Sequence, residues 1–210
     1  MLNLTGSTFG LPTIGSAYGG GFFAGQVNVS GTVYNLVVAD KTVGETFGLT
    51  WGAYAVTVGV SSVINGPTNT STLAALGPPY DAAIFCQDLV TGGYSDWYLP
   101  AQNELEVLYY FLKPSSTSNN TASGSNANAV APEPISTNYS AGSPSQTSAT
   151  TFRTGASSQE FVNGGHYWSS TENGSAFAWC ILFSTGELVQ RYKHNFLGSN
   201  YTRAVRRVAA

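Results

Sequence analysis

The sequence offers few side chains for metal or redox chemistry. Its only imidazoles are those of His166 and His194, and its only thiols are those of Cys86 and Cys180. Neither pair has the short H-x-x-x-H or C-x-x-C spacing that zinc sites use. His194 falls in an expected turn, where exposure to solvent is the simplest interpretation, and His166 follows two glycines. We therefore expect no metal ion and no cofactor.

Nucleophilic and acid–base catalysis find little support. The nearest match to a serine nucleophile elbow, Gly124-Ser125, lies in a low-complexity stretch without the strand, turn and helix that such a site needs. The carboxylates of Glu104, Glu106, Glu172 and Glu187 are scattered, so a pair suited to glycoside hydrolysis could meet only through the tertiary fold. The sequence therefore predicts a protein that is not an enzyme.

The composition restricts the class of protein. Of the 210 residues, 42% are hydrophobic but only 9% are charged, and the net charge is -3. A polar surface made of Ser, Thr, Asn and Gly is typical of proteins outside cells, on virions or in surface appendages. The acidic balance argues against a nucleic-acid partner. The few late cations are expected on solvated strand faces: Arg191, Lys193, Arg203, Arg206 and Arg207.

Membrane insertion and secretion by a leader are not indicated. No apolar run is long enough to span a bilayer. The first residues, MLNLTGSTFGLP, do not have the charged and apolar regions of a signal peptide.

The N-terminal half predicts a β-hairpin followed by helices. Residues 21–39 alternate apolar and polar side chains around Ser30-Gly31, as two paired strands do. Trp51-Gly52 is expected in a short strand or an ordered loop. Apolar residues recur at helical spacing over 81–89 and 104–112, which predicts two helices.

The C-terminal part predicts strands. Residues 167–170 form a short strand, and the nearly all-apolar 176–183 is typical of a central strand buried on both faces. A turn leads into 187–193, and 201–208 makes the last strand. The order of hairpin, two helices, long loop and antiparallel meander predicts the α+β class.

A stretch poor in large apolar side chains separates these parts. Residues 114–151 are dominated by Ser, Thr, Asn, Ala and Pro, so they cannot form a core of their own. A segment of this length is a functional loop, an excursion packed on a partner, or disordered. We treat 1–210 as a single domain with an N-terminal arm over 1–17 and a low-complexity insertion over 114–163.

Four ordered blocks of the sequence resemble a known family. They are GGYSDWYLPAQNELEVLY at 92–109, YWSSTE at 167–172, AW followed by F-x-x-G within 178–186, and RAVR at 203–206. In this order they resemble the C-type-lectin-like family typified by the C-terminal domain of the Lcl-type collagen-like bacterial adhesin, which also occurs in phage virion proteins. The resemblance implies a C-type-lectin-like fold, with two helices packed on a twisted antiparallel sheet and a binding surface on the loops.

The chain departs from two relatives of this family. Calcium-dependent lectins carry E-P-N or Q-P-D and a W-N-D strand, whereas here Glu133-Pro134-Ile135 lies in the insertion and no W-N-D occurs. The resemblance therefore does not imply calcium-dependent sugar binding. Neither Cys86 nor Cys180 resembles the reactive cysteine of the sulfatase-activating enzymes. Some family members have a cysteine where Ala204 stands, and its absence weakens the case for a bridge to Cys86. One disulfide and a buried reduced pair both remain open.

Residues in the C-terminal turns are the candidates for ligand contact. Trp97, Trp168 and Trp179 could stack on sugars, but the family blocks place them in packed elements, so we expect them in the core. Tyr and Asn give large, adaptable contacts at low entropic cost. The candidate binding residues are Asn173, Tyr192, His194, Asn195, Phe196, Asn200 and Tyr201. They could equally be ordinary turn residues.

Two hypotheses of function follow from the resemblance and the composition. In the first, the chain is a receptor-binding or adhesion module, either of a phage tail fibre or tip or of a bacterial surface adhesin, and binds a host cell-surface glycan or protein. In the second, it is a structural virion subunit, such as a capsid decoration or tail component, and contacts other virion proteins. The expected location is the virion surface or, alternatively, the bacterial cell surface, and a homo-oligomer such as a trimer is expected.

Overall fold

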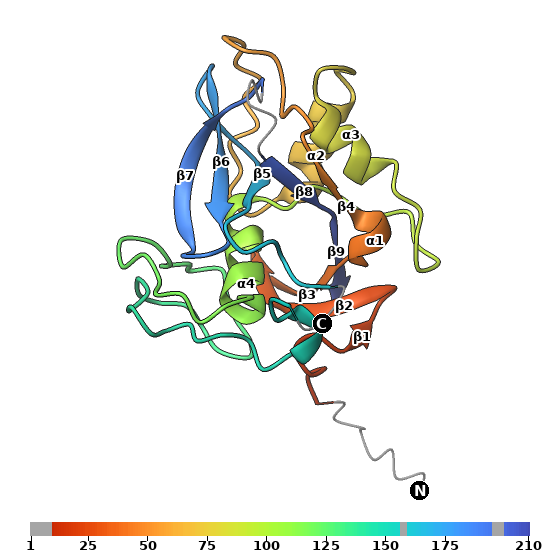
Figure 1. Cartoon of the computed structure of the whole chain (residues 1–210). Coiled ribbons are helices and arrows are strands. Elements are labelled where there is room, and N and C mark those ends of the chain that lie inside the picture. The colour runs from red at the N-terminus through yellow and green to blue at the C-terminus, as the bar shows by residue number, and fades with distance from the viewer. Residues whose placement is uncertain (1–9, 156–158, 195–199) are drawn as a thin grey trace, which may run out of the picture.

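Two β-sheets and four α-helices make up the computed structural model, which describes residues 10–155, 159–194 and 200–210. The first sheet has the order β1-β2-β3-β9, and the second has the order β4-β8-β5-β6-β7. In Figure 1 the second sheet occupies the upper part of the molecule and the first sheet the lower part. The strands are β1 Ala17–Tyr18, β2 Gly21–Val29, β3 Thr32–Val38, β4 Glu45–Phe47, β5 His166–Asn173, β6 Phe177–Leu182, β7 Glu187–Tyr192, β8 Asn200–Arg203 and β9 Val205–Ala209. The helices are α1 Lys41–Gly44, α2 Gly66–Ala74, α3 Asp81–Gln87 and α4 Gln102–Leu112, with a 3-10 turn, η1, at Thr150–Phe152.

The predicted hairpin is confirmed as β2 and β3. Its two-residue turn has positive φ at Ser30 (52°) and Gly31 (92°), which is the twist that joins antiparallel strands tightly. The side-chain oxygen of Asn28 accepts a hydrogen bond from the Gly31 N–H at 2.8 Å and so holds the turn closed.

Both predicted helices are confirmed as α3 and α4, but the expectation of two helices is wrong because α1 and α2 are also present. Helix α2 has the sequence GPTNTSTLA, and its strong helix breakers and short polar residues hide the helical period. It forms because Pro67 sits in its first turn and because Asn69, Thr70 and Leu73 are buried against the rest of the fold.

The predicted last strand over 201–208 is divided in two. Ala204 is buried and connects β8 of the second sheet to β9 of the first. Its N–H donates to the Gly44 carbonyl at 2.9 Å, and its carbonyl accepts from the Ala39 N–H at 3.0 Å. The β5–β6–β7 meander is confirmed, but β8 does not extend it: β8 lies between β4 and β5 and runs parallel to β5. The α+β class is thus confirmed, whereas the single antiparallel sheet is wrong.

The insertion packs on its own domain. Its backbone at residues 128–131 pairs with β2 at Gln26 and Asn28, where β1 no longer covers that edge. Several of its apolar side chains join the core around α4: Ala129, Ile135, Tyr139, Phe152 and Phe161. At its start the buried Lys113 ammonium donates to the Thr117 carbonyl and to Asn119 Oδ1, both at 2.6 Å. The segment therefore completes the core instead of standing outside it.

The second core cluster contains both cysteines. Cys86 and Cys180 are fully buried and unbridged, in a cluster that includes Trp51, Trp97 and Trp168. Burial raises the pKa of both thiols, which keeps them protonated and unreactive.

The expectation that 176–183 is buried on both faces holds only in part. Ala178, Cys180 and Ile181 are buried, whereas Phe177 and Trp179 are partly exposed. They lie on the same face of β6 as Ile181, which reaches the core around α4.

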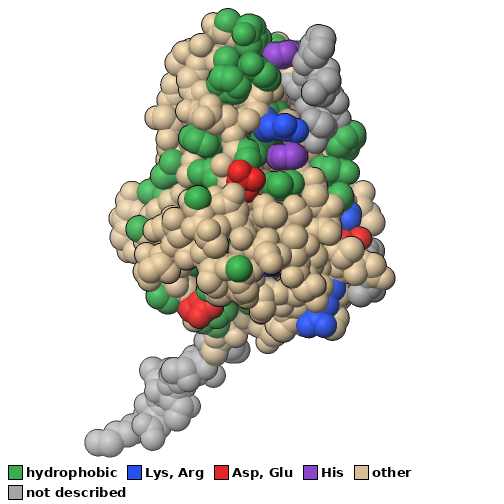
Figure 2. All heavy atoms as spheres, turned by 60° about the vertical axis from the view of Figure 1, so that its left-hand side comes forward, with side chains coloured by type: hydrophobic (Ala, Val, Ile, Leu, Met, Phe, Trp, Pro, Cys, Tyr) green, Lys and Arg blue, Asp and Glu red, His purple; other side chains and the backbone are tan. Residues whose placement is uncertain are grey.

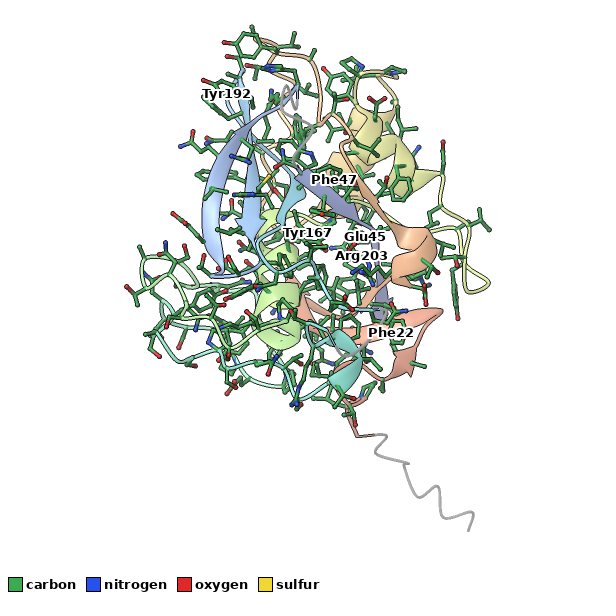
Figure 3. All side chains as sticks on the ribbon, in the orientation of Figure 1. Phe22, Glu45, Phe47, Tyr167, Tyr192 and Arg203 are labelled. Carbon is green, nitrogen blue, oxygen red and sulfur yellow. The ribbon has the colours of Figure 1, made fainter. Side chains whose placement is uncertain are left out.

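A buried arginine joins the two sheets. The side chain of Arg203 is fully buried and donates to the Ala39 carbonyl through both Nε (3.0 Å) and Nη2 (2.7 Å). Its Nη1 donates to the carboxylate of Glu45 at 3.0 Å, which also accepts from the Tyr167 hydroxyl at 2.9 Å. Its guanidinium lies 5.3 Å from the centre of the Phe161 ring. Figure 3 shows Glu45, Tyr167 and Arg203 together between the sheets.

This arrangement corrects the expectation for the late cations. Lys193, Arg203 and Arg206 are buried and paired instead of lying on solvated strand faces. The segments that carry or adjoin these cations are strands, as predicted. An alternating pattern, however, does not indicate which face of a strand another segment covers.

Replacing Arg203 tests the role of this pair. Arg203→Met should lower the free energy of unfolding by about 3–5 kcal/mol, because it leaves the buried Glu45 carboxylate with only the more distant Lys41 ammonium, at 3.8 Å, as counter-charge. The double variant Arg203→Met/Glu45→Gln should recover much of this loss, because no buried charge remains. Urea denaturation of the three proteins measures both values. A double variant as unstable as the single one would show that the guanidinium's bonds to Ala39 matter more than the charge.

Candidate functional site

Four aromatic side chains, two exposed and two half-buried, form a cluster at one end of the molecule. We call Tyr54, Phe177, Tyr192 and His194 the distal aromatic patch. The Tyr54 and Tyr192 rings are 6.1 Å apart, and the His194 ring lies 4.9 Å from Tyr54 and 5.6 Å from Tyr192. The Phe177 ring lies 4.6 Å from Tyr192. Tyr54 is 55% exposed and Tyr192 52%, so these rings present apolar area to solvent, and hydrophobic side chains gather at this upper end in Figure 2.

The patch is assembled from two segments that are far apart in sequence. Phe177 and Tyr192 are paired residues of the β6–β7 hairpin, so their side chains lie side by side on one face. Tyr54 comes from the loop between β4 and α2. The backbone N–H groups of Trp51 and Gly52 donate to the Lys193 carbonyl at 2.8 and 3.2 Å, which ties this loop to the end of β7.

A buried ion pair fixes the rest of this loop. The fully buried Lys193 ammonium contacts the Glu172 carboxylate at 2.5 Å and donates to the Val56 carbonyl at 2.7 Å. The same carboxylate accepts from the backbone N–H groups of Val58 (2.8 Å) and Gly59 (2.6 Å). The loop that carries Tyr54 is therefore bonded before Tyr54 to the Lys193 carbonyl and after it to the charged groups of Lys193 and Glu172.

A cleft of about 310 Å³ opens on the face of the β6–β7 hairpin that also carries Phe177 and Tyr192 of the patch. Trp179 of β6 forms one wall, Gln102 and Glu106 of α4 form another, and the insertion closes the third. The full lining is Gln102, Glu106, Asn120, Ala122, Ser123, Gly124, Ser125, Asn138, Trp179, Glu187 and Leu188. Trp179 thus differs from Trp97 and Trp168, which are buried in the core as expected.

One carboxylate of this cleft is nearly inaccessible to water. Burial raises the pKa of Glu106 to about 7, although hydrogen bonds from Tyr139 and from the Gly124 backbone lower it. The Tyr139 hydroxyl donates to Oε1 of Glu106 at 3.1 Å. Glu106 therefore links α4 to the insertion and takes up a proton near neutral pH.

The imidazole of His166 is not poised for acid–base chemistry. It is partly buried at the start of β5, and burial and then the nearby Arg191 charge lower its pKa to about 4. It is therefore neutral at physiological pH. Within residues 10–155, 159–194 and 200–210, no three His, Cys, Asp or Glu side chains come together as metal ligands.

A comparison with protein families places the chain. The model of the Lcl C-terminal domain matches residues 40–206, which is more than half of the chain. The chain belongs to the Lcl C-terminal domain family. No curated protein sequence matches it. The match includes β4 to β8, all three walls of the cleft and every residue of the distal aromatic patch.

Membership of the Lcl C-terminal domain family indicates an adhesin-like domain at a surface or outside the cell. The family is associated with adhesins and is not known as enzymatic. None of the helices in the described part of this Lcl-type domain is long and apolar enough to cross a membrane.

The structure brings together some of the candidate binding residues and separates others. Tyr192 and His194 belong to the patch, and Asn173 pairs with Phe177 beside it. Asn200 is buried, and its Oδ1 accepts from Arg191 Nε at 3.3 Å. Tyr201 lies apart from the patch, with its ring 4.7 Å from Phe47 and 5.2 Å from Tyr167. The remaining two candidates, Asn195 and Phe196, lie outside the described residues.

Sequence reasoning missed Tyr54, Phe177 and the cleft. Tyr54 follows Trp51-Gly52 in a stretch predicted to be a short strand or an ordered loop. A large aromatic residue in an ordered loop is the feature of the sequence that could have marked Tyr54 as a candidate for ligand contact. Phe177 and Trp179 were hidden in an apolar run that predicted burial. Their partial exposure depends on which segments cover β6, and the sequence of β6 does not contain that information.

Removing the Lys193 ammonium should loosen the patch. Lys193→Ala leaves the Glu172 carboxylate buried and is expected to lower the free energy of unfolding by about 3–5 kcal/mol. Amide hydrogen exchange at Val58 and Gly59, whose N–H groups bond to Glu172, should become faster. Lys41→Ala is the control, because Lys41 is 22% exposed, its ion pairs are longer at 3.8 and 3.6 Å, and it bonds a carbonyl of another segment, so its loss should be smaller. Equal losses in both variants would contradict the anchoring role of Lys193.

The raised pKa of Glu106 predicts a pH-dependent stability. Because the folded protein holds the proton up to about pH 7, the contribution of Glu106 is full below its ordinary pKa of 4.5 and is lost as the pH rises through 7. Glu106→Gln removes this dependence, so its stability relative to the wild type should rise by about 3 kcal/mol between pH 4 and pH 8. Chemical denaturation across this range measures the difference, with Glu133→Gln on the surface of the insertion as control. A difference that is constant with pH would contradict the shift.

Proposed function

We propose that this adhesin-like domain is a receptor-binding module that contacts a host cell surface through the distal aromatic patch. The observation that carries the proposal is the pair of tyrosines, each more than half exposed, that packs with His194 and Phe177 on anchored backbone. Rigid aromatic side chains give large contact area at low entropic cost, and they are enriched where binding energy is concentrated.

The position of the patch supports this role. In Figure 3 Tyr192 lies at the upper end of the molecule, whereas the described chain begins at the lower end. An attachment through the N-terminal side would therefore leave the patch facing outward. Half of the eight cationic side chains, Lys113, Lys193, Arg203 and Arg206, are buried in the fold. Contact with a receptor would then rely mainly on aromatic, amide and hydroxyl groups.

We further propose a phage particle as the carrier, with the domain at a tail fibre or tip and in the C-type-lectin-like fold. The low charge and the Ser-, Thr-, Asn- and Gly-rich surface support a particle exposed to the outside. The pairing of β9 with β3 brings the C-terminal strand beside the N-terminal hairpin, as that fold requires. A bacterial surface adhesin has the same requirements and is the alternative carrier.

Substitution of the two tyrosines tests the binding role. Tyr54→Ser and Tyr192→Ser should each weaken binding of the labelled protein to intact bacterial cells by about tenfold or more. Flow cytometry over a panel of strains measures this binding. Val90→Ser is the matched control, because Val90 is 74% exposed and lies in the loop after α3, away from the patch.

Two results would contradict this proposal. One is unchanged cell binding by the tyrosine variants. The other is normal attachment of particles that lack the protein, combined with lower particle stability, which would indicate a structural virion subunit instead.

A further inference from the structure

The four tryptophans of the chain fall into two groups. The indole N–H groups of Trp51, Trp97 and Trp168 each donate to a backbone carbonyl, with N to O distances of 2.6, 3.2 and 3.1 Å for the shortest bond of each. All three side chains are buried. Trp179 is partly exposed, and within the described residues its indole N–H has no partner. A donor that is left free on an aromatic wall of a cleft is available to a ligand.

We propose that the cleft around Trp179 binds a neutral saccharide unit. The inference deepens the proposed receptor-binding function and rests on it for its biological meaning. The volume of about 310 Å³ is at the small end of ligand sites and suits one or two sugar rings. One face of a pyranose is formed by C–H groups, which pack on the electron-rich face of an indole, while its hydroxyls need both donors and acceptors nearby.

The polar groups of the cleft match such hydroxyls. The side chains of Gln102 and Ser125 have no hydrogen-bond partner among the described residues, so an amide and a hydroxyl are available there. Ser123 Oγ accepts from the Leu188 N–H at 3.1 Å and retains its own proton for donation. Amides and hydroxyls both donate and accept, as sugar hydroxyls do.

The charges of the cleft exclude an anionic ligand. Two carboxylates, Glu106 and Glu187, line it, and none of its lining residues is Lys, Arg or His. A sulfate, phosphate or carboxylate on the sugar would find no counter-charge in the cleft and would be repelled by Glu187. An ammonium ligand would bind less well, because the Glu106 carboxyl group is 3% exposed and already accepts a hydrogen bond from Tyr139. A neutral ligand therefore fits best.

The cleft is held in shape before a ligand arrives. The insertion is clamped to the β6–β7 turn by the Asn120 N–H, which donates to the Thr185 carbonyl at 2.8 Å. Gly124 has a φ of 118°, and a side chain there would collide with the Tyr139 ring, so the chain passes close to that ring only because this residue is glycine. A preformed site loses little conformational entropy on binding.

The cleft leads toward the distal aromatic patch. Trp179 and Phe177 are two residues apart in β6, so they point to the same face of the sheet, about 7 Å from each other. Gln190, which pairs with Trp179, is exposed between the cleft and Tyr192. A saccharide chain with one unit on Trp179 can therefore extend along the hairpin to the patch.

Titration with sugars tests this site directly. The probes are neutral disaccharides (cellobiose, lactose and chitobiose), sulfated and sialylated lactose, and glucosamine as a cationic sugar. At least one neutral disaccharide should bind with a Kd on the order of 1 mM and change the fluorescence of Trp179, with calorimetry as the second measurement. Trp179→Ala should weaken this binding by about tenfold or more, and Gln102→Ala should weaken it to a smaller extent. Melting temperatures close to that of the wild type confirm that both variants fold.

The outcomes separate this inference from the proposed function. Binding of none of the neutral sugars, preferential binding of the anionic or cationic probes, or unchanged affinity in Trp179→Ala would overturn the saccharide site. If cell binding still depends on Tyr192 in that case, the proposed function stands alone. If disaccharides bind through Trp179 while Tyr54→Ser and Tyr192→Ser leave cell binding unchanged, the saccharide site stands and the patch does not.

Discussion

The buried guanidinium of Arg203 is the constraint on which the rest of the structure depends. A charge without access to water must be neutralised and fully hydrogen-bonded, or the fold loses several kcal/mol. Its partners come from the end of β3 at Ala39, from β4 at Glu45 and from the end of the insertion at Gln159. Segments from most of the length of the chain must therefore meet at one point. The passage through Ala204 from one sheet to the other takes place immediately beside this charge.

A second buried cation organises the distal end in the same way. Lys193 stands between Tyr192 and His194, and its pair with Glu172 binds the loop that carries Tyr54. The exposed aromatic rings are therefore supported by charges beneath them. In a protein with 9% charged residues, this use of cations leaves a surface of aromatic, amide and hydroxyl groups. Because half of the cationic side chains are used inside the fold, few remain for the surface, and none lines the Trp179 cleft. This absence of positive charge is the reason for proposing a neutral ligand there.

Contacts between the sequence blocks explain why they identify the family. Asp96 of the first block forms a bidentate ion pair with Arg206 of the last block, at 2.7 and 2.9 Å. Tyr98 pairs its backbone with Val205, and its hydroxyl donates to Glu104 at 2.7 Å. The stretch that most resembles an active-site loop is thus a junction that holds the first sheet to α4. The proposed ligand contacts include Gln102 of the first block and Trp179 of the third, but the others come from the loop of Tyr54, from β7 and from the insertion.

The sequence alone determined the α+β class, the hairpin, α3, α4 and the β5–β7 meander, because each is encoded by a local period of apolar residues or by a local turn. It also supported the family, through blocks in a fixed order. Only the tertiary structure decided that α2 is helical, that 201–208 divides at Ala204, and that Tyr54 joins Tyr192 while Asn200 is buried. It alone decided that Trp179, unlike Trp97 and Trp168, faces a cleft. The reason is that a local pattern tells which side chains share a face, whereas burial depends on whether a distant segment covers that face.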